Sequence, residues 1–178
     1  VLEDASGQAD IKQVSSAAMA SAFRPLAEPT LNAGYSRSAF WMKIDLSYTP
    51  RDTQQHADWL LELAYPPMDH VDVYLFDADG EQQMVWKTGE LLPFARRQIR
   101  QNNYLFELPL KAGQTMTAYV RVSSNGSIQA PLNLWSSHAY LEEQPARIYV
   151  LGLIYGVLLG MLVYNLFIYI SVRDPGYL

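Results

Sequence analysis

One uninterrupted apolar stretch constrains this chain more than any other feature of its sequence. Between Ile148 and Val172 there is no charged residue and no proline. A helix needs about 20 mostly apolar residues to cross the hydrocarbon core of a bilayer, and this stretch is long enough. Tyr149 and Tyr169 stand near its ends, where aromatic rings favour the boundary between lipid and water. We therefore expect a transmembrane helix at 148–172 rather than a buried helix of a soluble protein.

Three glycines at intervals of four residues lie within this stretch. Gly152, Gly156 and Gly160 would form one stripe on a helix. Small residues in such a stripe let a second helix approach closely. Because so little sequence follows the stretch, we expect the chain to be a piece of a longer protein. The remaining transmembrane helices of that protein would then pack against the stripe.

The residues before the apolar stretch have the composition of one globular domain. They number about 145, the size of an ordinary domain. We expect this domain at 1–140, a short connector at 141–147 and a stub at 173–178. Without cysteine, the chain forms no disulfide and no thiolate metal site, and its net charge of −5 argues against a nucleic-acid partner. Basic residues do not fix the orientation of the helix, because Arg147 precedes it and Arg173 follows it.

Alternation of apolar and polar residues predicts β-strands throughout this domain. In residues 40–46 the even-numbered positions are apolar and would face a core, whereas Trp41, Lys43 and Asp45 would face away from it. Residues 71–76 and 116–123 alternate in the same manner. Further strands are expected at 59–64, 84–87, 104–110 and 132–135.

Shorter elements and turns complete the predicted pattern. We expect an edge strand at 11–14, a turn at 32–34, a polar loop at 50–56 and a short helix from Ser136 to Gln144. Asp79-Gly80 and Asn125-Gly126 are typical of hairpin turns. About eight short strands with turns between them predict an all-β fold, namely a β-sandwich of the jelly-roll type, followed by one transmembrane helix.

Four segments carry a resemblance to a known family. They are FWMKIDL (40–46), WLLELAYPPMDHVDVYLFDADG (59–80), GELLPFARRQIRQNNYLFELPL (89–110) and YVRVSSNGSIQAPLNLW (119–135). In this order before an apolar span, they resemble the second extracellular domain of the bacterial seven-transmembrane receptors with diverse intracellular signalling modules (7TMR-DISM). The third segment is the most specific, and the span, with Tyr164-Asn165 inside it, resembles the first of the seven helices.

This resemblance implies a place and a role for the chain. The domain would be a periplasmic jelly roll, similar to carbohydrate-binding modules, that senses a ligand often proposed to be a carbohydrate. The N-terminal domain would lie in the periplasm and Arg173 on the cytoplasmic side of the bacterial inner membrane. A bundle of seven helices would pass the signal to a cytoplasmic kinase, diguanylate cyclase or phosphodiesterase, in two-component or cyclic-di-GMP signalling. Six of those helices and the output domain are missing from this sequence.

Side chains on the polar side of neighbouring strands are the first candidates for ligand binding. If their strands pair in one sheet, they combine aromatic rings, cations and carboxylates on one surface. Aromatic faces stack on sugar rings, and charged groups bond to sugar hydroxyls or to a small anionic ligand. An ordinary solvated sheet face whose groups pair with one another is an equally good interpretation. The candidates are Trp41, Lys43, Glu62, Asp72, Tyr74, Tyr119 and Arg121.

An arginine cluster in residues 89–100 is the second candidate. Arg97 matches the recurrent arginine of the resembled family, and its guanidinium could clamp a carboxylate or phosphate. The alternative is that Arg97 braces its own loop through backbone carbonyls. Arg96 and Arg100 are interpreted as surface charges.

We expect no metal, no cofactor and no catalytic activity in this chain. The three histidines lack metal-ligand spacing. The sequence from Asp77 to Gly80 resembles a calcium loop only faintly, because Thr88 stands where the closing glutamate would be. Glu62, Asp69 and Glu90 could form a glycosidase pair, but nothing in the sequence sets their separation. Three tryptophans are interpreted as packing residues: Trp59, Trp86 and Trp135.

Two functions therefore remain open for the domain. The first is a ligand-sensing domain of a transmembrane receptor, which binds a carbohydrate or a small anion. The second is a module that binds another protein or forms a homodimer without any small ligand.

Overall fold

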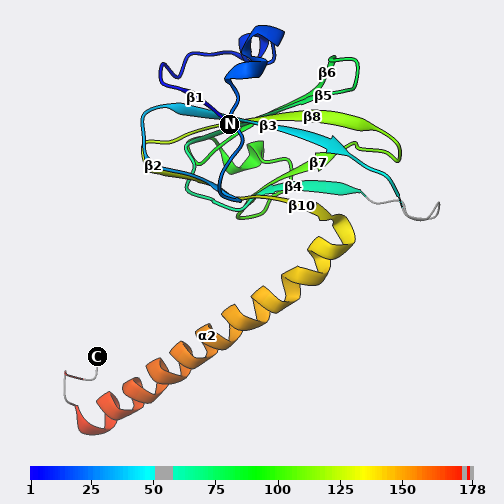
Figure 1. The fold of residues 1–178 in the computed structure, drawn as a ribbon. Helices are drawn as coiled ribbons and strands as arrows, with labels where there is room; N and C mark the ends of the chain where they lie inside the picture. Colours follow the sequence, from blue (N-terminus) through cyan, green and yellow to red (C-terminus); the bar gives the residue numbers. More distant parts are fainter. Residues whose placement is uncertain (51–57, 174–175, 177–178) are drawn as a thin grey trace. The chain divides into compact units, whose positions relative to one another are not determined.

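The structure is a computed structural model that describes residues 1–50, 58–173 and 176 (Figure 1). The chain divides into two compact units, Val1–Ser137 and His138–Leu178. The loop predicted at 50–56 lies, from residue 51 onward, outside the described residues.

Three antiparallel sheets make up the first unit (Figure 1). The largest has the order β1-β3-β8-β5-β6, formed by Leu2–Asp4, Ala39–Ser47, Thr115–Ser123, His70–Phe76 and Gln82–Thr88. The second has the order β10-β4-β7, formed by Leu132–Ser136, Trp59–Leu63 and Tyr104–Leu108. The third pairs β2 (Leu31–Tyr35) with β9 (Ser127–Ala130). The helical elements are α1 (Ile11–Val14), η1 (Ala17–Ala22), η2 (Phe94–Arg96) and α2 (Ser137–Val172).

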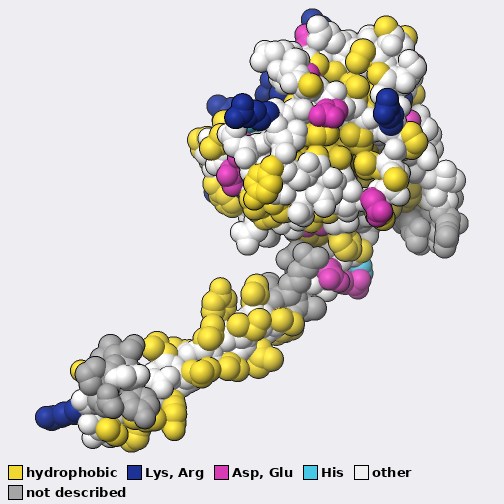
Figure 2. All heavy atoms as spheres, turned by 60° about the vertical axis from the view of Figure 1, so that its left-hand side comes forward, with side chains coloured by type: hydrophobic (Ala, Val, Ile, Leu, Met, Phe, Trp, Pro, Cys, Tyr) yellow, Lys and Arg dark blue, Asp and Glu magenta, His cyan; other side chains and the backbone are white. Residues whose placement is uncertain are grey.

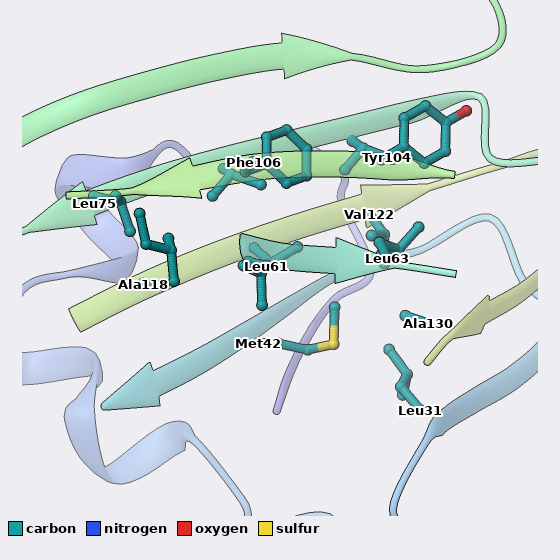
Figure 3. Close-up of a cluster of buried hydrophobic side chains, with 14 of the residues drawn as sticks. Leu31, Met42, Leu61, Leu63, Leu75, Tyr104, Phe106, Ala118, Val122 and Ala130 are labelled. Carbon is teal, nitrogen blue, oxygen red and sulfur yellow. The ribbon is translucent and has the colours of Figure 1, made fainter. Parts of the chain in front are cut away.

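The main core lies between the five-stranded sheet and the two smaller sheets (Figure 3). Met42, Leu75 and Val122 reach it from the large sheet, and Leu61 and Phe106 reach it from the three-stranded sheet. Each of these side chains is at most 3% exposed. Burial of such side chains contributes about 1.5–3 kcal/mol each. The predicted all-β sandwich followed by an apolar helix is confirmed.

The seven strands predicted from the alternation of apolar and polar residues are all present. The strand register explains why the alternation marks them. Strands β3 and β8 pair over eight positions, from Phe40 opposite Val122 to Ser47 opposite Thr115. The apolar positions of both strands therefore enter the core together. Strands β1, β2 and β9 were not predicted.

Three local predictions are wrong. Residues 11–14 form helix α1 rather than a strand, because Asp10 and Gln13 make a reciprocal capping box. Residues 32–34 lie within β2, whose register shifts between Asn32 and Gly34 as in a β-bulge. Asn125-Gly126 joins strands of two different sheets and is therefore not a hairpin turn.

Helix α2 follows the last strand without a loop. Strand β10 ends at Ser136 and α2 begins at Ser137, so the short helix predicted to end at Gln144 is part of one continuous helix. Among the described residues, one stretch, Tyr149–Val172, is long and apolar enough to cross a membrane. Hydrophobic side chains extend along this stretch (Figure 2). They are exposed, as expected for a surface that faces lipid or other helices.

Gly89 holds the entry to the 89–103 loop against strand β5. Its φ of +149° lies in a region that side chains rarely adopt. A Cβ atom on Gly89 would lie 1.9 Å from the carbonyl oxygen of Asp69. The next residue, Glu90, donates its N–H to the carbonyl of Met68 at 2.8 Å. Only glycine allows the two backbones to approach this closely.

We predict that Gly89→Ala destabilises the first unit by at least about 3 kcal/mol, because the backbones must separate. The matched control is Gly126→Ala, whose Cβ would lie 3.5 Å from the Ser124 hydroxyl. It should cost less than about 1 kcal/mol. Thermal unfolding followed by near-ultraviolet circular dichroism measures both, and equal midpoints for the two variants would contradict the prediction.

Candidate functional site

Most of the predicted ligand residues do come together on one face of the five-stranded sheet. Trp41 lies opposite Arg121, and Lys43 lies opposite Tyr119. Across the next pair of strands, Tyr119 lies opposite Tyr74 and Arg121 lies opposite Asp72. We call the face formed by Trp41, Lys43, Asp72, Tyr74, Tyr119 and Arg121 the aromatic face.

The N-terminal segment, residues 1–24, covers this aromatic face. Trp41, Tyr74 and Tyr119 are buried in a cluster with Val14, and Phe23 packs against the cluster. The rings of Trp41 and Tyr74 stack with centroids 5.8 Å apart, and Phe23 meets Tyr119 edge-on at 6.1 Å. The aromatic rings of this face are therefore closed to a ligand while the segment is in place, whereas Lys43 stays exposed.

The charged side chains of the aromatic face interact with other groups of the same chain. Arg121 donates from Nη2 to the carbonyl of Gly7 at 3.0 Å, and its Nη1 lies 3.7 Å from a carboxylate oxygen of Asp72. Burial raises the pKa of Asp72, and the positive charge of Arg121 only partly offsets this effect. Lys43 is directed to Asp45 at 3.6 Å. Polar pairing within the chain is the alternative that the sequence left open.

Asp4 fixes the first turn of the N-terminal segment. Its carboxylate accepts hydrogen bonds from the backbone N–H groups of Ser6, Gly7 and Ala9, and from the Ser6 hydroxyl. Burial alone would raise the pKa of Asp4, but these hydrogen bonds outweigh it and lower the pKa below its ordinary value. The ionised carboxylate thus stabilises the segment.

Glu62 lies on the three-stranded sheet and is not part of the aromatic face. Its side chain is fully buried. Oε1 accepts from Asn103 Nδ2 at 2.7 Å, and Oε2 accepts from Asn133 Nδ2 at 3.1 Å and from Trp135 Nε1 at 2.8 Å. The carboxylate therefore ties β4 to β10 and to the residue before β7. Trp135, interpreted as a packing residue, is also a hydrogen-bond donor.

Arg97 makes the contacts of the loop-bracing alternative. Its Nη1 donates to the backbone carbonyls of Gln101 and Asn102. Its guanidinium lies 4.9 Å from the ring centroid of Phe94 and 4.3 Å from that of Tyr104, within cation–π range. A ligand role for Arg97, like one for Glu62 and the aromatic face, stays a prediction.

An open cleft at one end of the sandwich is accessible without any rearrangement. It consists of two adjoining hollows of about 530 and 320 Å³, which share Asp77, Ala78, Thr115 and Met116. The larger hollow lies within the ~300–1,000 Å³ range of small-molecule sites. We call the two hollows together the end cleft. The lining of the larger hollow combines the apolar Met84, Pro109 and Met116 with the polar Asp77, Asp79, Gln83, Lys111, Gln114 and Thr115.

Strand pairing explains why two distant turns form this cleft. Phe76, the last residue of β5, lies opposite Thr117 near the start of β8. The turn after β5 and the turn before β8 therefore lie at the same end of the sheet. Asp77 fixes the first turn by accepting from the N–H groups of Asp79 and Glu81. The sequence predicts a hairpin turn at Asp79-Gly80 but no cleft, although antiparallel pairing of residues 71–76 with 116–123 would place the two turns together.

Carboxylates outnumber cations in the end cleft. Asp77 and Asp79 line the larger hollow with a single lysine, Lys111, and Asp45 lines the smaller hollow. Within the part of the chain that the structure describes, Asp79 and Lys111 form no ion pair, so both are available to a ligand. Among the same residues, no group of three or more histidine or acidic side chains could hold a metal ion. The arrangement suits a polar organic ligand with an apolar side.

The family model described as 7TMR-DISM extracellular 2 matches residues 1–136. No curated protein matches the chain.

We predict that the N-terminal segment loosens in acid. Since its folded pKa is lowered, the stabilisation from Asp4 is present above the ordinary value of 3.8 and is lost as pH falls through the folded value. The protection factor of the Ala9 amide should stay level from about pH 7 to 5 and fall below about pH 4. Asp4→Ala should lower it at pH 7 and remove its fall in acid. A protection factor that is insensitive to both changes would refute this role of Asp4.

We also predict that Glu62→Ala destabilises the first unit by more than about 3 kcal/mol, because three partly buried donors lose their fully buried acceptor. Glu107→Ala is the matched control. Glu107 lies on the adjacent strand β7, is exposed and should cost less than about 1 kcal/mol when truncated. Chemical denaturation measures both variants, and similar losses would mean that the Glu62 network contributes little.

Proposed function

The chain belongs to the 7TMR-DISM extracellular 2 family, and from this premise we propose that residues 1–136 are the outward-facing sensory domain of a bacterial membrane receptor. The domain lies in the periplasm, and Tyr149–Val172 crosses the inner membrane. In the longer receptor, the glycine stripe of α2 packs against further transmembrane helices. A cytoplasmic output domain, in two-component or cyclic-di-GMP signalling, receives the signal.

One observation supports this function above the others. The family match ends at residue 136, and α2 begins at Ser137. No loop separates the sensory domain from the helix, so a change in strand β10 is carried directly into the helix backbone. A flexible linker would absorb such a change.

A neutral carbohydrate is the ligand that the end cleft fits best. Met84, Met116 and Pro109 offer an apolar surface for the C–H groups of a sugar ring, and the surrounding polar groups can bond to its hydroxyls. The excess of carboxylates disfavours an anion, because like charges repel in a partly enclosed site. Of the two ligand classes predicted from the sequence, we therefore propose the carbohydrate.

A protein partner is the second candidate, and strand β6 favours it. This strand forms one edge of the five-stranded sheet. Met84 and Val85 are 41% and 40% exposed on it. An exposed strand edge is a template for pairing with another chain. A homodimer through β6 would be the corresponding assembly.

The test uses the full chain in lipid nanodiscs, which avoids detergents with sugar headgroups. We expect D-glucose, D-galactose or N-acetyl-D-glucosamine to raise the unfolding temperature, because a ligand that binds only the folded state stabilises it. D-Glucuronate and D-galacturonate should have a smaller effect than the neutral sugars of the same stereochemistry. Asp79→Ala should weaken sugar binding by roughly tenfold or more.

The matched control is Glu81→Ala, in the same turn as Asp79 but outside the cleft lining. It should bind sugar as the unmodified chain does. No stabilisation by any neutral sugar would contradict the carbohydrate proposal. If concentration-dependent dimerisation accompanied that result, the β6 assembly would be favoured instead.

A further inference from the structure

A further hollow, separate from the two hollows of the end cleft, lies in the first unit beside the end of strand β10. Its volume is about 400 Å³. Met84 and Pro109 line both this hollow and the larger part of the end cleft, so the two adjoin each other. We call it the junction pocket. Its other lining residues are Asp58, Trp59, Gln98, Glu107, Leu108 and Ser137.

Trp59 gives this pocket an aromatic wall. The ring meets Tyr48 edge-on at 5.2 Å, which fixes its orientation. Its indole N–H is buried and has no acceptor among the described residues. The N–H therefore does not open into the hollow, and what Trp59 offers a ligand is the face of its ring, on which a sugar ring can stack. The sequence favours a packing role for Trp59 over a role as a ligand platform.

The other walls of the junction pocket select the same ligand chemistry as the end cleft. Leu108 and Pro109 are apolar, and the carboxylates of Asp58 and Glu107 are acceptors for hydroxyl groups. No lysine or arginine is among the described lining residues. A neutral ring with hydroxyl groups fits this combination, whereas an anion finds no counter-charge.

The junction pocket also contacts the residue from which α2 continues. Ser137 donates both its N–H, at 2.9 Å, and its hydroxyl, at 3.1 Å, to the carbonyl of Asp58. The preceding residue, Ser136, lies opposite Trp59 in the β10–β4 pair. A ligand that moves the backbone at Asp58 or Trp59 therefore changes the hydrogen bonds that hold Ser137.

We propose that the junction pocket is a second subsite of the end cleft, that the ligand is a neutral saccharide of at least two rings, and that filling this subsite alters the hydrogen bonds at Ser137. One ring occupies the end cleft beside Asp79, and the next ring packs on Trp59. The proposal rests on the proposed function, since it extends the same ligand from one hollow into the other. In this proposal the end cleft and the junction pocket both bind the saccharide, and the junction pocket alone passes the change to Ser137.

The test compares monosaccharides with their dimers on the full chain in nanodiscs. D-Glucose is compared with maltose and cellobiose, and N-acetyl-D-glucosamine with its β-1,4-linked dimer. We expect one dimer to bind at least tenfold more tightly than its monosaccharide, and Trp59→Phe to reduce that advantage by about fivefold or more, because the phenyl ring offers a smaller face for stacking than the indole. Trp86→Phe, outside the pocket lining, is the control.

A second readout reports on the helix junction. Hydrogen exchange at the Ser137 amide should change by about tenfold with the dimer, but not with the monosaccharide. If Trp59→Phe does not fold, Glu107→Gln serves as the second variant, because it keeps the size of an exposed side chain and removes its charge.

The outcomes separate this inference from the proposed function. A dimer that binds no more tightly than its monosaccharide, or one whose binding is unaffected by Trp59→Phe and Glu107→Gln, overturns the second subsite. Sugar binding that depends on Asp79 would then still support the sensory function. Absence of binding by every saccharide overturns both proposals.

Discussion

The central strands of the five-stranded sheet, β3, β8 and β5, are covered on both faces over much of their length, and the rest of the domain depends on this. One face packs against the two smaller sheets through side chains such as Leu75 and Phe106. The other face carries Trp41, Tyr74 and Tyr119, which the N-terminal segment removes from water. Where both faces are covered, a ligand has access to the sheet at its edges and at the turns between its strands. The end cleft lies at two such turns, and the junction pocket lies beside Met84 of the edge strand β6 and Trp59 of β4.

Sequence reasoning identified what alternation and apolar length encode. Strands such as 40–46 and the apolar span were readable because each shows a period or a length that few other structures share. Helix α1 has only four residues, too few for helical periodicity, and its capping box was overlooked. Alternation also assigned Trp41 correctly to the side away from the main core. It could not reveal that the first 24 residues return to cover that side, because such contacts join segments far apart in sequence.

The candidate site shows the same limit. The partners of Glu62 lie 41 to 73 residues away along the chain, so no local pattern announces them. The end cleft arises where two turns meet, and the junction pocket arises where Trp59 meets the last strand. Residues at turns carry weak periodic signals, yet turns on a rigid sheet are where binding sites commonly form. Strand β10 ends at Ser136 and α2 begins at Ser137, and the proposed transmission depends on this direct continuation of the backbone.

Locating a bound sugar tests this account most directly. A high-resolution structure of the full chain with a neutral saccharide that stabilises it would show which surface is occupied. The account predicts density in the end cleft beside Asp79, continuing along Trp59, with residues 1–24 still over the aromatic face. Density on Trp41 and Tyr119, with the N-terminal segment displaced, would contradict it and would restore the face first suggested by the sequence.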